Sequence, residues 1–192
     1  MQLKEIIKNA SLMLGKLDVV KYLENEKTDT IGADTLESVN LMVNLANLVI
    51  NELACTYVPL VTEEQIVFSN QKAYYKNFKK KAVKILGVFD NAGCAVDFID
   101  KTEYILLNSA FSSSQTLLVE YQYLPDNYSL TDTIGYSDVQ ISARVIAYGV
   151  ASEACISEGD FDQAVMHHKR YVDEIALISM PKNATIKQRS WR

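Results

Sequence analysis

The sequence predicts an α+β fold, in which a small antiparallel β domain is inserted between the N-terminal and C-terminal helices of a bundle. Two observations carry this prediction. Apolar residues recur at helical spacing before residue 58 and after residue 137, whereas the middle of the chain has the two-residue period of strands. Helices at both ends with strands grouped between them are typical of α+β rather than α/β proteins.

Residues 1–58 are expected to form the N-terminal helices. A first helix ends at Gly15, a natural stop, and a longer one runs from about Asp34 to Ala54. The longer helix has two apolar stripes, so both of its sides should be covered, the second by the rest of the fold or by a neighbouring subunit. The first stripe comprises Leu36, Val39, Val43, Ala46, Ile50 and Leu53, and the second Leu41, Leu45 and Leu48.

Residues 59–125 are expected to form the β domain, as a sandwich or barrel of five or six short strands. The segment 91–93, Asn-Ala-Gly, is a hairpin signal that would return the chain from the strand 84–90 into the segment 94–99. Further β-rich runs lie at 65–69, 104–107 and 116–123.

Residues 126–179 are expected to contain two C-terminal helices that pack on the N-terminal ones. Ser137 or Asp138 would cap the first, and Gly159 would end it. Asp160 would cap the second, which reaches about Ile178. Its expected buried stripe is Phe161, Val165, His168, Val172 and Ile175.

Charge is segregated along the chain, which has 19 basic and 24 acidic residues. Ten of the bases fall in two blocks without acids, which leaves nine bases against 24 acids elsewhere. Surfaces of opposite sign orient partners or self-assembly. The first block, which we call the lysine segment, comprises Lys72, Lys76, Lys79, Lys80, Lys81 and Lys84, and the second Lys182, Lys187, Arg189 and Arg192.

The lysine segment also contains aromatic residues, and basic residues with aromatics can bind nucleic acid. No nucleic-acid motif accompanies them, and the chain as a whole is acidic. A surface that contacts protein or solvent is therefore favoured. A secondary contact patch is expected at Lys76, Lys79, Lys80 and Lys81.

Motifs for chemistry are missing from the sequence. It has no Gly-rich phosphate loop, no HExxH and no GxSxG, so we expect neither an enzyme nor a bound cofactor. Three scattered cysteines and two adjacent histidines predict no metal site and no disulfide framework. The thiols should be mostly buried, with His168 on a packed stripe and His167 facing solvent. The sequence has no run of about 18 apolar residues, so no membrane span is expected. No signal peptide is expected at the N-terminus either.

The C-terminal segment, residues 180–192, is expected to be an extended basic tail. Such polar residues bury too little apolar surface to fold alone. Trp191, the single tryptophan, lies beside Arg189 and Arg192, and Trp and Arg are the residues most enriched at interface hot spots. The tail is therefore predicted to anchor the chain on another protein.

Several of these segments resemble the head–tail connector, or adaptor, proteins of tailed bacteriophages. The resemblance lies in Val119–Pro125 closing the β region, the helix Ile146–Glu153, the turn Glu158–Ala164, Lys169–Tyr171 and the basic Trp-containing end. It implies a helical bundle with a β domain, assembled as a homo-oligomeric ring, usually of twelve copies, beneath the portal in the virion neck.

The resemblance further implies that the ring extends the DNA channel and carries the tail or a head-closure protein. DNA would pass without sequence-specific binding, and no membrane is involved. The C-terminal segment of such proteins commonly reaches the portal, which implies docking by Lys187, Arg189, Trp191 and Arg192. Two other readings stay open, a head-closure or tail-completion ring protein and a small ligand-binding or enzymatic α+β protein.

Overall fold

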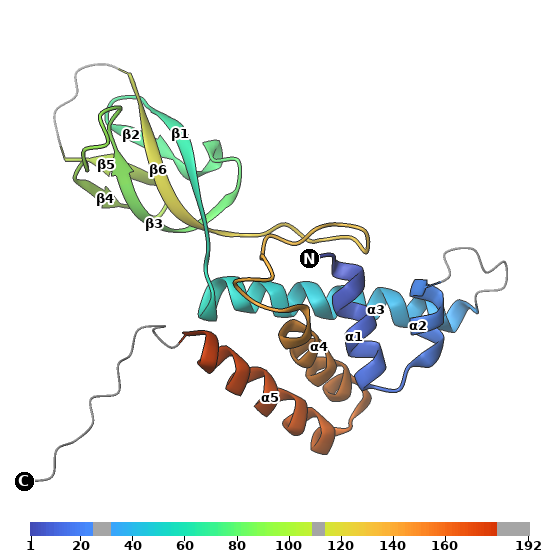
Figure 1. Ribbon diagram of the computed structural model, residues 1–192. Helices are drawn as coiled ribbons and strands as arrows, with labels where there is room; N and C mark the ends of the chain where they lie inside the picture. Colours follow the sequence, from blue (N-terminus) through green and yellow to red (C-terminus); the bar gives the residue numbers. More distant parts are fainter. Residues whose placement is uncertain (25–31, 109–113, 180–192) are drawn as a thin grey trace, which may run out of the picture. The chain divides into compact units, whose positions relative to one another are not determined.

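The computed structural model describes residues 1–24, 32–108 and 114–179. It confirms the α+β class: five helices and two small antiparallel sheets occur among the described residues (Figure 1). The chain divides into two compact units. The helical unit comprises residues 1–49 and 128–192, and the β unit comprises residues 50–127. The predicted basic tail, residues 180–192, lies outside the described residues.

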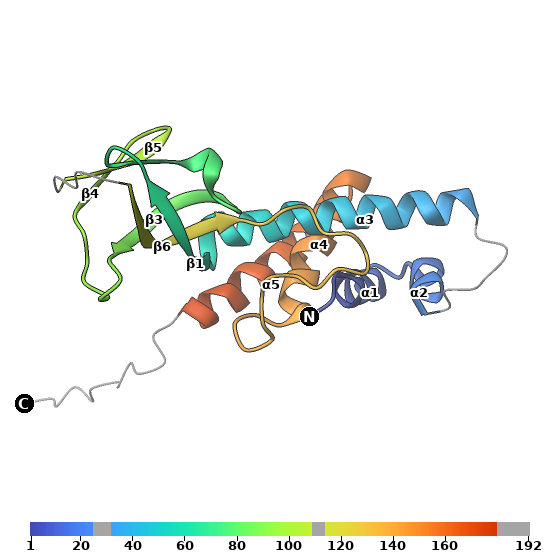
Figure 2. The ribbon, with the colours of Figure 1, turned by 90° about the horizontal axis from the view of Figure 1, so that it is seen from above.

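The helical unit is built around its fourth helix. The helices are α1 (Leu3–Met13), α2 (Leu17–Glu24), α3 (Ala33–Glu52), α4 (Ala143–Glu158) and α5 (Phe161–Ser179). Eleven of the 16 residues of α4 are buried, because α1, α3 and α5 pack around it (Figures 1 and 2). Helix α4 is thus apolar on nearly every side, as expected of a central core helix.

The two ends of α4 show how local sequence sets helix boundaries. Gly159 adopts φ +80° and its N–H reaches back to the Cys155 and Ile156 carbonyls, so the predicted stop is confirmed. The predicted start at Ser137 or Asp138 is wrong, because α4 begins at Ala143 with Ser142 as N-cap. Ser137 instead accepts backbone bonds from Gln140 and Ile141 in a separate turn before the helix.

The two apolar stripes of α3 differ in burial within the chain, and coverage of the second stripe by a neighbouring subunit stays a prediction. Val39, Met42, Ala46 and Val49 are buried, but the second stripe is not, since Leu41 and Leu48 are 37% and 53% exposed. Among the described residues, the segment 33–57 is long and apolar enough to cross a membrane by length and composition alone. A core helix passes the same test, and 44% of the most apolar window is buried within the protein.

The register predicted for α5 is also wrong. The side chains that face the core are Ala164, His167, Tyr171 and Ile175, whereas Phe161 and Val165 are 65% and 69% exposed. Asp160 is the cap that was expected, because its carboxylate accepts the Gln163 N–H at 3.2 Å. The buried stripe is therefore rotated by about one residue from the prediction, and His167 occupies the position expected for His168.

The β unit contains two three-stranded antiparallel sheets. The first has the order β1 (Leu60–Phe68), β6 (Gln115–Leu124) and β3 (Lys81–Phe89). The second has the order β2 (Lys72–Tyr74), β5 (Tyr104–Leu107) and β4 (Phe98–Asp100). Alternate residues of β6 are buried, and this pattern fits a sheet with one face against a core.

Two turns decide how the sheets are connected. Asn70 and Gln71 both have positive φ, a conformation in which Asn is common, and this two-residue turn takes the chain from β1 into β2. The predicted turn at 91–93 is present, with the Asp90 carboxylate accepting the Ala92 and Cys94 N–H groups. The returning chain meets β3 at a single bridge, Phe89 with Ala95, and then pairs with β5 instead.

Candidate interaction site

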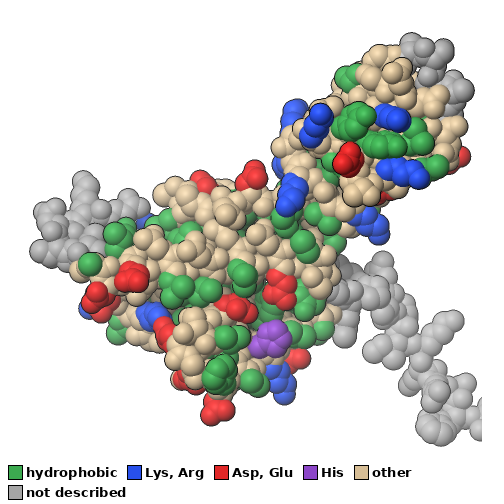
Figure 3. All heavy atoms as spheres, turned by 180° about the vertical axis from the view of Figure 1, so that it is seen from behind, with side chains coloured by type: hydrophobic (Ala, Val, Ile, Leu, Met, Phe, Trp, Pro, Cys, Tyr) green, Lys and Arg blue, Asp and Glu red, His purple; other side chains and the backbone are tan. Residues whose placement is uncertain are grey.

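The lysine segment lies along one continuous stretch of the β unit. It starts in β2, passes through the short 3₁₀ helix η2 (Tyr75–Asn77) and ends in β3. Strands β2 and β3 are each at the edge of their sheet, where side chains are open to solvent. Lys72 is half-buried, and the other five lysines are exposed. Figure 3 shows Lys side chains interleaved with apolar ones over this unit.

Three lysines of this segment rest on tyrosine rings. The Lys80 Nζ lies 3.8 Å from the Tyr123 ring centroid. The Lys72 Nζ lies 4.9 Å from the Tyr104 ring and the Lys76 Nζ 5.5 Å from the Tyr74 ring. Each contact is a cation–π geometry, which holds the ammonium group in place without neutralising its charge. Among the described residues, both ion pairs lie in the helical unit, Lys8 with Glu24 and Lys16 with Glu158.

Glu64 is one of the carboxylates that lie beside the lysine segment, and other donors bind its Oε2. Its Oε2 accepts the Tyr121 hydroxyl at 2.7 Å and the Lys79 backbone N–H at 3.1 Å. Burial, followed by the bond to Glu64, raises the pKa of Tyr121 to about 12. The pair thus fixes the loop before β3, and it leaves the ammonium group of Lys79 free to bind elsewhere.

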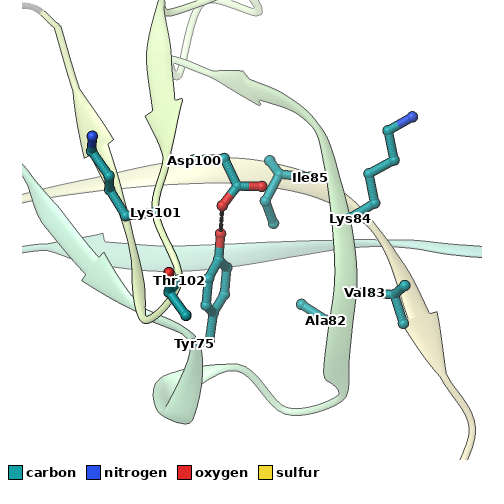
Figure 4. Close-up of a pocket in the computed structure, with 8 residues that line it drawn as sticks. All are labelled: Tyr75, Ala82, Val83, Lys84, Ile85, Asp100, Lys101 and Thr102. Atoms are coloured by element: carbon teal, nitrogen blue, oxygen red, sulfur yellow. Dashed lines mark hydrogen bonds between the residues drawn. The ribbon is translucent and has the colours of Figure 1, made fainter.

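A pocket of about 370 Å³ opens between β3 and the β4–β5 turn (Figure 4). The Tyr75 hydroxyl donates to Asp100 Oδ1 inside it. Burial, with this bond and the Asp100 charge, raises the pKa of Tyr75 well above its usual value. Lys84 and Lys101 extend away from the pair. The bond joins η2 to the last residue of β4.

The helical unit presents a second exposed surface, the outer face of α5. Four of its large apolar side chains are 47–69% exposed: Phe161, Val165, Met166 and Leu177. Asp162 and Asp173 are also exposed, and their spacing of eleven residues places them on one side of the helix. The outer face of α5 thus combines large apolar side chains with the acidic Asp162 and Asp173 and the basic Lys169, whereas a merely solvated helix face is polar.

Some of the contact residues predicted from the sequence lie among the described residues and others lie outside them. Lys76, Lys79, Lys80 and Lys81 are all exposed and follow one another in the lysine segment. The proposed portal contacts, Lys187, Arg189, Trp191 and Arg192, lie outside the described residues. Sequence reasoning missed the outer face of α5. Ala164 and Tyr171, seven residues apart and therefore on the same side of the helix, are the signal of the true buried stripe.

Two predictions about single residues are wrong. His167 is buried and His168 exposed, the reverse of the expectation, because the buried stripe of α5 passes through Ala164 and Tyr171. Burial lowers the pKa of His167, and the nearby Arg170 lowers it further. Of the cysteines, Cys155 is buried in α4 as expected, but Cys55 is exposed in the π-helical segment Leu53–Tyr57 after α3, and Cys94 is exposed after the turn at 91–93.

The described residues contain no cluster of three or more His, Cys, Asp or Glu side chains that could hold a metal ion. Their most distinctive surfaces are therefore the lysine segment and the outer face of α5, both suited to contacts with macromolecules. Compared with known proteins, the chain matches no protein-family model and no curated protein sequence.

Proposed function

We propose that this chain is a structural virion protein, a head–tail connector that forms a ring beneath the portal of a tailed bacteriophage. The ring would extend the DNA channel and provide a platform for the tail. The observation that carries the proposal is the outer face of α5, which exposes four large apolar side chains on a long helix. Exposed apolar area of this kind marks an interaction surface.

The segments that resemble connectors support the proposal through the part they play in the fold. Ile146–Glu153 is the buried middle of α4, and Glu158–Ala164 forms the turn from α4 into α5. The Ser152 hydroxyl donates to the Ala164 carbonyl at 3.0 Å, so the two segments hold each other. Residues of the resemblance thus build the helical hairpin that presents the outer face of α5.

The experiment is co-expression of the full chain with the portal protein of the same phage. Native mass spectrometry is expected to find a ring of this chain on the portal ring. Deletion of residues 180–192 should abolish docking while leaving thermal unfolding unchanged, since the described core lies before residue 180. A portal that never binds the full-length chain contradicts the proposal, and a tail deletion that still docks contradicts the assignment of the tail.

A ligand-binding role is the alternative that a specific observation favours, because the pocket beside Tyr75 and Asp100 is large enough for a small molecule. Thermal-shift screening of the purified protein tests this role, since a ligand that binds the folded state raises the unfolding temperature. A reproducible shift that Tyr75→Phe removes would support ligand binding.

The other alternative is a head-closure or tail-completion ring protein. A map of the assembled particle decides whether the chain lies at the portal or at the head-closure level of the neck.

A further inference from the structure

We infer that the outer face of α5 in one copy of this chain docks on the lysine segment of the β unit in a second copy. The contact is head-to-tail, because it joins two different surfaces. This inference rests on the proposed ring-forming function and deepens it, since it names the surfaces that join neighbouring copies. Head-to-tail contacts that close on themselves generate rings.

Charge is the first argument. In the described helical unit, seven lysines and arginines stand against thirteen carboxylates. The lysine segment has six ammonium groups, and the described ion pairs use none of them. Glu64, one of the carboxylates beside the segment, already accepts from Tyr121 and from the Lys79 backbone. A run of six lysines is complementary to the excess of carboxylates on the helical unit of another copy.

The mixed character of both surfaces is the second argument. Asp162 and Asp173 share the outer face of α5 with apolar residues such as Val165 and Leu177. On the β unit, Val83 is 50% exposed between Lys81 and Lys84, and Tyr74 is 40% exposed beside Lys76. Apolar and charged groups therefore alternate on both surfaces. When two surfaces of this kind meet, the contact buries apolar area and brings opposite charges together.

Nucleic acid is the competing partner for the lysine segment. Phosphates and bases would use the same ammonium groups and tyrosine rings. They would leave the apolar outer face of α5 without a partner, whereas a second copy covers both surfaces with one contact. The second copy is therefore the occupant that accounts for more of the described surface.

Charge reversal tests the contact. The lysine variant is Lys79→Glu with Lys81→Glu, and the acidic variant is Asp162→Lys with Asp173→Lys. All four side chains are exposed, and no hydrogen bond or ion pair of these side chains is recorded among the described residues. A control is Lys21→Glu, a charge reversal at an exposed site of α2 outside both surfaces. Circular dichroism checks that each variant folds.

Sedimentation velocity of the full-length chain is the readout. Wild type and control should self-associate. Each charge-reversal variant should associate at least about tenfold more weakly, because a like-charge contact replaces an attractive one. Mixing the two variants in equal amounts should restore association, since each supplies the surface that the other has lost. That rescue also shows that both variants are folded.

The inference is overturned if the mixture fails to associate, if the variants associate like wild type, or if wild type stays monomeric at its highest soluble concentration. It is also overturned if the lysine variant loses binding to an oligonucleotide while its self-association is unchanged. Portal docking is scored separately. If the charge-reversal variants associate like wild type and still dock on the portal, the contact between copies is refuted and the proposed function stands. If the chain self-associates as predicted but never docks on the portal, the contact stands and the proposed function is refuted.

Discussion

Gly149 in α4 lies directly beneath the ring of Tyr171 in α5. A Cβ atom at Gly149 would stand 3.0 Å from Tyr171 Cε2 and 2.7 Å from Val49 Cγ1 of α3. Three helices of the helical unit thus approach one another at a point where no side chain fits. The close approach explains a glycine in the middle of a buried helix, a position that glycine otherwise destabilises.

Gly149→Ala is expected to destabilise the helical unit. The gain in helix propensity is about 1 kcal/mol, but overpacking a filled core costs about 1–3 kcal/mol, and here the methyl meets two side chains at once. Denaturant unfolding measures the difference. The matched comparison is the same substitution in a Val49→Ala background, where the Cγ1 atom nearest to the added methyl is gone, and its cost should be smaller there. An equal cost in both backgrounds would refute the packing argument.

Asn47→Ala is expected to loosen the chain that enters the C-terminal helices. The Asn47 side chain accepts the Tyr128 N–H at 2.7 Å and donates to the Tyr128 carbonyl at 2.9 Å. Removing it leaves buried backbone groups without these partners, at a cost of about 1–3 kcal/mol. Asn44→Ala, one turn earlier on the exposed side of α3, is the control. Hydrogen exchange should speed up at residue 128 in the first variant alone.

Acid should destabilise the protein through His167 before the carboxylates titrate. Burial and Arg170 lower its folded-state pKa below the usual value of about 6.5, so the unfolded chain binds the proton more tightly. Stability from this group is complete above about pH 6.5 and falls as pH decreases toward the folded pKa. Both ring nitrogens lack hydrogen-bond partners among the described residues, so no hydrogen bond compensates the charged form for its burial, and the ring stacks on Tyr148.

Unfolding midpoints between pH 7 and pH 5 measure this effect. His167→Phe keeps an aromatic ring on Tyr148 and should flatten the profile over that range. His168→Gln changes the exposed neighbour and should leave the profile as in wild type. A His167→Phe profile as steep as wild type would assign the acid sensitivity to other groups.

Tyr121→Phe is expected to weaken the β unit by about 1 kcal/mol, the usual net value of a hydrogen bond. It deletes the hydroxyl that donates to Glu64 but keeps the ring, which packs edge-on against Phe78 at 4.9 Å. The raised pKa of about 12 means that the neutral tyrosine stabilises the fold below about pH 10, and that this contribution is lost as pH rises toward 12.

Ultraviolet difference titration of wild type against Tyr121→Phe checks that value. The phenolate signal that the variant lacks should appear above pH 11, because the Tyr121 pKa of about 12 lies well above the usual value of about 10. Tyr104→Phe, which lies under Lys72 and has no such carboxylate bond, serves as the comparison. A difference signal for Tyr121 near pH 10 would contradict the role of Glu64.

The sequence alone determined the α+β class and several boundaries of elements. Gly15, Gly159 and Asp160 act on their immediate neighbours, through a positive φ or a cap bond, so their effects are local and readable in order along the chain. The change from helical to two-residue periodicity likewise needs no knowledge of what covers each face.

Tertiary structure decided which faces are covered. A helix with apolar residues on several sides fits more than one register, and α5 turned Ala164, His167 and Tyr171 inward because Gly149 leaves room for the Tyr171 ring. The same choice exposed Val165 beside Asp162 and created the outer face of α5. On the β unit, pairing of β4 with β5 brought Asp100 to Tyr75 from 25 residues away, a contact that no local pattern encodes.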